Sequence, residues 1–249
     1  MGIEIKSARE IEIMRRAGRI VAETLVVVAD KVRPGITTRE LDELTYRTIT
    51  RQGATPSFKG YHGFPASLCV SVNDEVVHGI PGKRTLKNGD IVGLDVGAYY
   101  KGFHGDAAVT VPVGKANGRV QVLLEAGQAG LAAAIAAARA GAYVGDISSA
   151  VQTTVEALGF SVVREYTGHG VGRALHEDPL VPNVGEPNSG ALLQPGMTLA
   201  LEPMINAGGW AVQVRPNGWT VVTRDGSWSA HFEHTVAITD GEADILTRL

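Results

Sequence analysis

Apolar residues recur every three and four positions near the start of the chain, which predicts helices there. Ser7 and Glu10 have the Ser-x-x-Glu form of a capping box, and apolar residues follow at helical spacing. Thr37 and Glu40 repeat this signal, and Gly53 provides a natural stop. The pattern therefore predicts one helix after Ser7 and a second after Thr37.

A second pair of helices is expected near the middle of the chain, over residues 117–141 and 146–158, with short β-prone runs between and after the two pairs. Residues 86–95 and 193–202 also share Leu, Gly, Leu and an acidic residue in register, 107 positions apart. A chance match of a loop and an apolar strand is one explanation of this echo. The other is a duplicated helix, helix, strand unit whose two halves share one sheet.

Four acidic residues lie within β-prone runs, where polar residues alternate with apolar ones. Asp95 and Glu202 share a strand face with small residues, which leave room beside each carboxylate. A third strand is expected around Asp106, and residues 231–238 are expected to form a fourth that carries Glu233. The sequence thus predicts that every one of these acids projects from a strand.

A carboxylate within an apolar strand is costly to bury unless a cation balances it. Each acid alone could face solvent or pair with one of the 23 basic side chains. Because neighbouring strands lie about 4.8 Å apart, four such acids can also converge, and clustered carboxylate oxygens suit divalent metal ions. His169, flanked by glycines, is the candidate nitrogen ligand, and His78 and His176 are candidates for binding substrate. The remaining histidines are expected near the site or on the surface.

Composition and charge narrow the class of protein. The 249 residues are 44% hydrophobic and 20% charged, as in ordinary globular proteins, and the net charge of -3 gives no sign of nucleic-acid binding. Cys69 is the single cysteine, which excludes an intramolecular disulfide and indicates a reducing compartment. No secretory signal is recognised, and the longest apolar run, residues 131–138, is shorter than the roughly 20 residues of a membrane span. We therefore expect a cytoplasmic protein with no membrane partner.

Five candidate ligands and their surrounding motifs resemble type I methionine aminopeptidases over nearly the whole chain. The motifs are residues 77–81, 102–106, 167–172 and 201–204, and the ligands are Asp95, Asp106, His169, Glu202 and Glu233. The resemblance implies an α/β (α+β) "pita-bread" fold with pseudo-two-fold symmetry, in which a curved, mostly antiparallel sheet carries two helix pairs on its outer face. It also implies that residues 1–249 form a single domain, which agrees with the internal echo.

The resemblance implies a hydrolase that removes the initiator methionine from nascent polypeptides when the second residue is small. Asp95 looks like a bidentate ligand of one metal ion, Asp106 and Glu233 like bridging ligands, and His169 and Glu202 like ligands of a second ion. Two divalent ions about 3.5–4 Å apart would activate a water for attack on the scissile carbonyl. Cobalt, manganese, iron, nickel and zinc all accept such ligands. The resemblance implies a monomer that acts on the N-termini of nascent polypeptides, and the ribosome is the candidate location.

In the family, Glu202 would also accept the proton, while His176 would stabilise the gem-diolate and His78 would contact the substrate backbone. Further positions that match the methionine pocket of the family are Tyr61, Phe64, Cys69 and Trp219. Each of these could equally be an ordinary core or loop residue.

Two positions depart from the family pattern. Gly97 stands where threonine is common, so a hydroxyl near the metal is expected to be missing. Leu175 stands where an aromatic residue is common, which alters the expected shape of the pocket.

Three other interpretations compete with this one. Aminopeptidase P, prolidase and creatinase relatives share the fold, but they usually carry an additional N-terminal domain of more than a hundred residues. A pita-bread domain that only binds proteins would be expected to lack some of the five ligands. A structural protein stabilised by calcium or magnesium would use the carboxylates but gives no reason for His78, His169 and His176.

Overall fold

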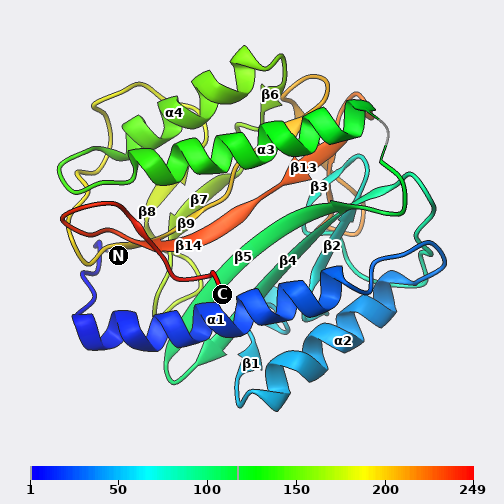
Figure 1. The fold of residues 1–249 in the computed structure, drawn as a ribbon, viewed down its shortest axis with the longest axis horizontal. Helices are drawn as coiled ribbons and strands as arrows, with labels where there is room; N and C mark the ends of the chain where they lie inside the picture. The colour runs from blue at the N-terminus through cyan, green and yellow to red at the C-terminus, as the bar shows by residue number, and fades with distance from the viewer. Residues whose placement is uncertain (1, 117) are drawn as a thin grey trace.

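Two pairs of helices lie on one side of a curved β-sheet (Figure 1). The computed structural model describes residues 2–116 and 118–249. The helices are α1 (Ala8–Ala29), α2 (Thr38–Arg51), α3 (Gly118–Ala137), α4 (Val144–Ala157) and the short 3₁₀ turn η1 (Tyr61–Gly63). The strands are β1 (Thr55–Pro56), β2 (Cys69–Val72), β3 (Glu75–Val77), β4 (Ile91–Tyr100), β5 (Phe103–Pro112), β6 (Ser161–Val162), β7 (Thr167–Gly170), β8 (Glu177–Pro182), β9 (Thr198–Leu201), β10 (Met204–Asn206), β11 (Val212–Val214), β12 (Val221–Thr223), β13 (Ser229–His231), β14 (Glu233–Ala237) and β15 (Asp244–Ile245).

The two predicted capping boxes begin α1 and α2. The Ser7 hydroxyl accepts a hydrogen bond from the Glu10 N–H, while the Glu10 carboxylate accepts one from the Ser7 N–H. Thr37 and Glu40 form the same pair at the start of α2. Gly53, just after α2, has a φ of 74°, a left-handed conformation that glycine adopts without strain. Local sequence therefore sets where these helices begin.

The second helix pair also forms, with slightly different bounds from those expected. The predicted start of α3 at Asn117 lies outside the described residues, and α3 ends at Ala137. By length and composition α3 could cross a membrane. Its apolar residues are, however, accounted for by packing, since side chains such as Leu123 and Leu131 belong to the main core cluster.

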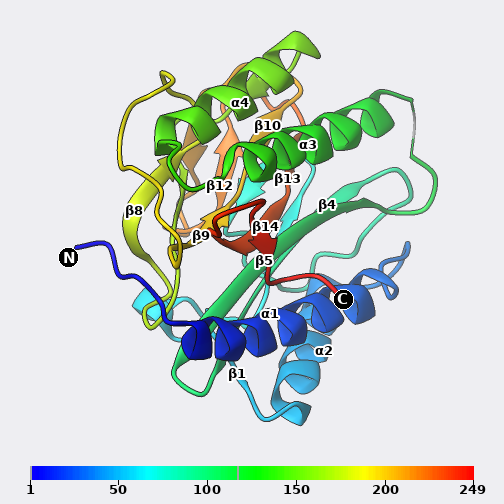
Figure 2. The same ribbon diagram turned by 60° about the vertical axis from the view of Figure 1, so that its left-hand side comes forward.

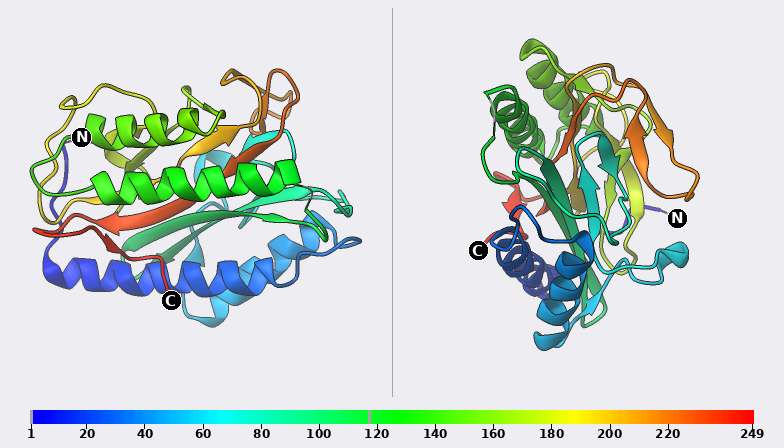
Figure 3. Two further views of the ribbon diagram at one scale, coloured as in Figure 1. Left: turned by 45° about the horizontal axis from the view of Figure 1, so that its top comes forward. Right: turned by 90° about the vertical axis from the view of Figure 1, so that its right-hand side faces the viewer.

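The central sheet is antiparallel throughout the described residues. Its main path runs β1-β4-β5-β14-β9-β7-β8, with β2 paired to β4 and β15 paired to β14. Helices α1 and α3 flank β5 and β14 on one face, as the turned views in Figures 2 and 3 show. The opposite face carries none of the four α-helices, and the short η1 turn lies on that side (Figure 3). Smaller sheets, β13-β10-β6 and β11-β12-β3, complete the structure.

The prediction of a single strand over residues 231–238 was wrong. The segment divides at Phe232 into β13, which pairs with β10, and β14, which pairs with β5 and β9. Phe232 is buried in the core cluster beneath α3, where its ring would lie only 2.4 Å from a Cβ placed on Gly127. The packing of this ring against α3 coincides with the break between the two strands, which the alternation of residue types did not indicate.

The internal echo is matched by repeated hydrogen bonds. In the first half, the Gly35 N–H donates to the Leu86 carbonyl at 2.9 Å. In the second half, the Gly141 N–H donates to the Leu193 carbonyl at 3.0 Å. Isolated bridges repeat as well, linking Thr37 to Thr85 and Tyr143 to Leu192. The pseudo-two-fold relation is therefore present in the backbone, and both halves contribute strands to the same sheet.

Candidate metal centre

The five predicted ligands lie on, or directly after, five neighbouring strands of the central sheet. The prediction that every acid projects from a strand was wrong for Glu202, because β9 ends one residue earlier, at Leu201. Asp95 lies on β4, Asp106 on β5 and Glu233 on β14. Glu202 directly follows β9, and His169 lies on β7. Because these strands are consecutive in the order β4-β5-β14-β9-β7, residues far apart in the sequence are brought side by side.

Strand register places the ligands on one face and leaves space between them. Ala108 is the register partner of both Asp95 and Glu233, and directly opposed residues of an antiparallel pair point to the same side. In the same way Ala200 is the partner of His169. Alanine methyl groups fill little of the volume between the strands, so the acids and the imidazole can approach one another.

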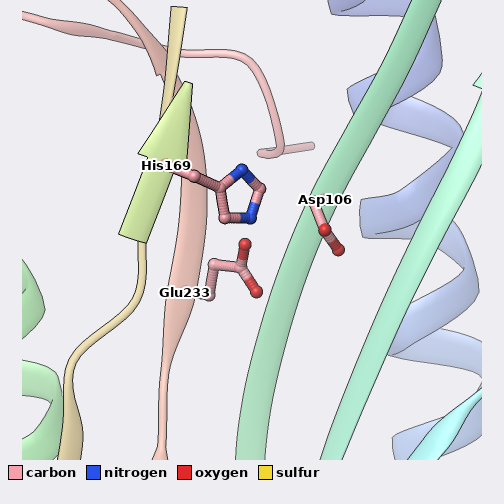
Figure 4. A group of neighbouring side chains, drawn as sticks. All are labelled: Asp106, His169 and Glu233. Carbon is pink, nitrogen blue, oxygen red and sulfur yellow. The ribbon is translucent and has the colours of Figure 1, made fainter. Parts of the chain in front are cut away.

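The side chains of Asp106, His169, Glu202 and Glu233 form a compact group of metal-donor atoms, here called the donor cluster. Ligand atoms of Asp106, His169 and Glu233 all lie within 4.8 Å of one another (Figure 4). The Nε2 atom of His169 lies 3.3 Å from Oε1 of Glu202, and Asp95 lines the same cavity as these residues. Figure 4 shows the His169 ring and the Glu233 carboxylate turned toward the same space beside β5.

The His169 tautomer is suited to metal binding. Its Nδ1 lies 2.8 Å from the Gly170 carbonyl oxygen, which can only accept a hydrogen bond. Nδ1 therefore carries the hydrogen, and the lone pair of Nε2 is directed at the acids, as is typical of histidine ligands. Burial lowers the pKa of His169 to about 3, so the ring is neutral at physiological pH.

The carboxylates lack the partners that buried acids need. Among the described residues, one oxygen each of Asp95, Asp106 and Glu233 is buried with no hydrogen bond. Burial raises the pKa of Asp95 to about 7, and burial with mutual repulsion raises the pKa of Asp106, Glu202 and Glu233 as well. Several carboxylate oxygens without hydrogen-bond partners, close to one imidazole nitrogen, form a set of ligands that suits divalent metal ions.

His176 is held beside the donor cluster by Tyr61. The Tyr61 hydroxyl lies 2.7 Å from Nδ1 of His176, and the His176 ring centroid is 4.2 Å from that of His169. His176 lies just before β8, so it reaches the site from the strand next to β7. The structure thus brings this predicted substrate-binding residue to the cluster.

His78 approaches the same space from a strained turn after β3. Its φ of 59° is uncommon for a residue with a side chain. The His78 carbonyl accepts a hydrogen bond from the Thr220 hydroxyl at 3.4 Å, and the ring packs edge-on against Trp219. Burial, followed by the neighbouring His176, lowers the pKa of His78 to about 4, so this ring is also neutral.

A small cavity of about 130 Å³ joins the donor cluster to an apolar wall. All four predicted pocket residues line this wall, together with Phe58, Leu175 and the two histidines above; they are Tyr61, Phe64, Cys69 and Trp219. The rings of Phe64 and Trp219 meet edge to face at 5.1 Å. Burial raises the pKa of the Cys69 thiol, so the thiol stays neutral. It therefore provides a polarizable contact surface in the pocket rather than a nucleophile.

The two departures from the family pattern have structural consequences. A Cβ on Gly97 would lie 2.7 Å from the Phe58 ring and 2.8 Å from the Ser57 side chain, so these two residues occupy the space above β4. Leu175 is buried in the apolar wall. Phe58 is a pocket residue that the sequence analysis missed, and the lack of a side chain at Gly97 was the one signal that a neighbour fills this position.

The other histidines lie in different surroundings. His104 is bonded to the Ser57 hydroxyl at 2.9 Å, His234 to the Thr247 hydroxyl at 2.8 Å, and His62 is exposed. His231 is buried next to Glu202 and Glu233. Of these four, His231 is the one that directs a ring nitrogen at the acid cluster.

A converging set of acids and one histidine on a curved antiparallel sheet, beside a partly open and largely apolar pocket, defines a metal-dependent hydrolase site. Residues 12–240 match the model of metallopeptidase family M24, and the chain belongs to this family. The fold is the pita-bread fold that the resemblance implied.

Within this family the chain is similar to methionine aminopeptidases. It is 54% identical to methionine aminopeptidase 1 of Bacillus subtilis, over 98% of each chain. It is 44% identical to the methionine aminopeptidase of Escherichia coli, over 99% of this chain and 94% of the relative. The crystal structure of the methionine aminopeptidase from Thermotoga maritima matches with a TM-score of 0.98 at 48% identity, covering 100% of both chains.

The fold is shared more widely than this. The prolidase from Pyrococcus furiosus matches 98% of this chain and 65% of its own length, with a TM-score of 0.81 at 23% identity. The fold alone therefore does not distinguish methionine aminopeptidases from prolidases, and substrate preference depends on the residues that line the pocket.

Proposed function

We propose that this chain removes methionine from the N-terminus of polypeptides whose second residue is small. The observation that carries the proposal is the 130 Å³ cavity, which has the acid cluster at one wall and aromatic rings with Cys69 at the other. A thioether makes favourable contacts with aromatic rings and is compatible with a neutral thiol. The cavity is much smaller than the roughly 300–1,000 Å³ typical of ligand pockets, which suits a single side chain beside one peptide bond.

The proposal includes two divalent ions, held by Asp95, Asp106, His169, Glu202 and Glu233. Four carboxylates carry the charge that two such ions balance, and the unpaired oxygens supply lone pairs for them. When bound, the ions would polarise the scissile carbonyl and lower the pKa of a water. Manganese, iron, cobalt, nickel and zinc all suit oxygen and imidazole donors.

The residues around the cluster supply the remaining chemistry. Glu202 accepts a proton from the attacking water and delivers it to the departing amine nitrogen. The water oxygen forms a bond to the carbonyl carbon, and the carbon–nitrogen bond breaks to release methionine. His176 stabilises the negative charge that develops on the carbonyl oxygen, and His78 contacts the substrate backbone.

The strained turn at His78 and the hydrogen bond between Tyr61 and His176 hold these two histidines in position. Tyr61 engages Nδ1 of His176, which leaves the other ring nitrogen available toward the donor cluster. The left-handed φ of His78 is a conformation that persists when surrounding contacts hold it, here Thr220 and Trp219. Both histidines are thereby pre-positioned before substrate arrives.

The proposal also covers the setting of the reaction. Residues 1–249 act as one catalytic unit, because the ligands come from strands of both halves. The partners are N-termini of nascent polypeptides, met at the ribosome, and neither nucleic acid nor membrane takes part. A buried, unpaired Cys69 is compatible with the cytoplasm. The chain acts as a monomer, and light scattering coupled to gel filtration tests this.

Peptide cleavage followed by mass spectrometry tests the function. Purified protein is incubated with Met-Ala-Ser, Met-Leu-Ser or Ala-Pro-Ser, with manganese or cobalt and with a chelator control. Loss of methionine from Met-Ala-Ser alone, only with metal, is the expected result. Cleavage of Ala-Pro-Ser instead would assign a proline-directed peptidase, and no cleavage with any metal would favour a binding protein.

A further inference from the structure

His231 lies beside the acid cluster with a ring nitrogen that has no hydrogen bond. The residue is 4% exposed, and its Nε2 is buried without a partner among the described residues. A buried polar atom left unsatisfied costs free energy comparable to that of a lost hydrogen bond. Such an atom therefore calls for a partner that the site supplies when it is complete.

The backbone of His231 is fixed by the strands that carry the ligands. Its N–H donates to the Thr110 hydroxyl at 2.9 Å, and its carbonyl accepts from the same hydroxyl at 2.8 Å. Thr110 lies on β5, which also carries Asp106. The register partner of His231 is Met204 at the start of β10, two residues beyond Glu202. The position of the ring relative to the acids is therefore set by neighbouring strands rather than by a loop.

The ring nitrogen is directed at two carboxylates. Nε2 lies 3.7 Å from Oε2 of Glu202 and 3.9 Å from Oε2 of Glu233. These distances exceed a hydrogen bond, yet a small rotation of either carboxylate would close them. The other oxygen of Glu202 lies 3.3 Å from Nε2 of His169, so Glu202 sits between two imidazole nitrogens, one facing each oxygen.

We propose that His231 is a positioning residue of the metal centre, which donates its Nε2–H to the carboxylates of Glu202 and Glu233 and holds them in place to bind divalent ions. Outer hydrogen bonds of this kind orient ligands, and their loss typically weakens metal affinity about 10- to 100-fold. The inference rests on the proposed function only in that these carboxylates bind metal. A histidine that merely filled space would behave differently, because an apolar side chain of similar size could replace it without loss.

Two substitutions separate these roles. His231→Met keeps much of the volume but removes the donor, whereas His231→Gln places an amide N–H near the position of Nε2. His234→Gln is the matched control, since His234 lies on the adjacent strand and is bonded to Thr247 instead. Chelator-stripped protein is titrated with Mn²⁺ alone by calorimetry, and dialysis followed by elemental analysis gives the number of ions bound.

We expect the Met variant to bind Mn²⁺ about 10- to 100-fold more weakly than the wild type, and the Gln variant to recover most of that loss. The control is expected to bind like the wild type. Visible absorption of the Co²⁺-loaded proteins provides a second readout, because the bands report ligand geometry. They should differ from wild type in the Met variant and return toward it in the Gln variant.

Wild-type Mn²⁺ affinity and Co²⁺ spectrum in the Met variant would overturn the inference. A Gln variant that folds but binds as weakly as the Met variant would overturn the hydrogen-bond role. If the Met variant does not fold, His231→Asn takes its place, because the shorter amide cannot reach Glu202. Metal affinity is measured without peptide, so a failure to remove methionine would count against the proposed function and leave this inference standing.

Discussion

Neutralising one buried acid should make the metal-free protein more stable while impairing its ability to bind metal. In the chelated wild type, Asp106 and Glu233 hold ligand oxygens within 4.8 Å of each other, with no cation between them. Two unit charges at that distance repel by about 3.5 kcal/mol at an effective dielectric constant of about 20. Glu233→Gln removes this repulsion and allows the new amide to donate to Asp106.

The expected gain is smaller than the full repulsion, because the wild type relieves part of it by binding a proton. For a chain of this size, 1 kcal/mol changes the melting temperature by roughly 2–4 °C. We therefore expect the chelated Glu233→Gln variant to melt about 3–10 °C above the chelated wild type at pH 8. Added Mn²⁺ should raise the melting temperature of the wild type strongly and that of the variant little.

The difference should depend on pH with a definite sign. Burial and neighbouring acids raise the pKa of Glu233 in the folded protein. Stability from such a group is complete below its unfolded pKa and is lost as the pH rises through the folded pKa. The two proteins should therefore melt alike near pH 4.5 and diverge toward pH 8, on the alkaline side of the pKa of about 7 of the neighbouring Asp95.

Differential scanning fluorimetry with chelator, at several pH values, measures this directly. Glu186→Gln, which makes the same change at an exposed position, is the matched control and should leave the melting temperature unchanged. A chelated Glu233→Gln variant that is no more stable than the wild type at pH 8 would refute the reasoning. It would mean that the acids do not repel one another in the folded protein.

Three further outcomes are expected. Asp106→Asn should abolish peptide cleavage while circular dichroism shows an intact fold. Wild-type turnover by this variant would contradict the assignment of Asp106 as a metal ligand. His176→Ala and His78→Ala should lower kcat at least tenfold with unchanged metal content, because both are proposed to contact substrate. Loss of metal with an unchanged rate per metal would make them structural. Gly97→Ala should cost about 1–3 kcal/mol in urea unfolding, because its Cβ would press on Phe58, whereas Gly93→Ala, whose Cβ would meet nothing nearer than 3.6 Å, should cost less.

Local sequence determined the helices and the composition of the site. The capping boxes at Ser7 and Thr37 work within one turn of chain, so they could be located without any knowledge of the rest of the fold. The echo between residues 86–95 and 193–202 also predicted the repeated backbone pattern. The acids could be recognised because a carboxylate within an apolar strand needs a compensating partner wherever the strand lies.

Tertiary structure decided how these pieces meet. The strand order β4-β5-β14-β9-β7 and the placing of Ala108 opposite two of the acids depend on long-range pairing, which no local pattern specifies. The break at Phe232 accompanies packing against α3, and the space above Gly97 is filled by Phe58 from a distant loop. His231 gains its place beside Glu202 in the same way. The sequence alone therefore determines which chemical groups are available. The distances between them depend on the sheet, because contacts among segments far apart in the chain fix those distances.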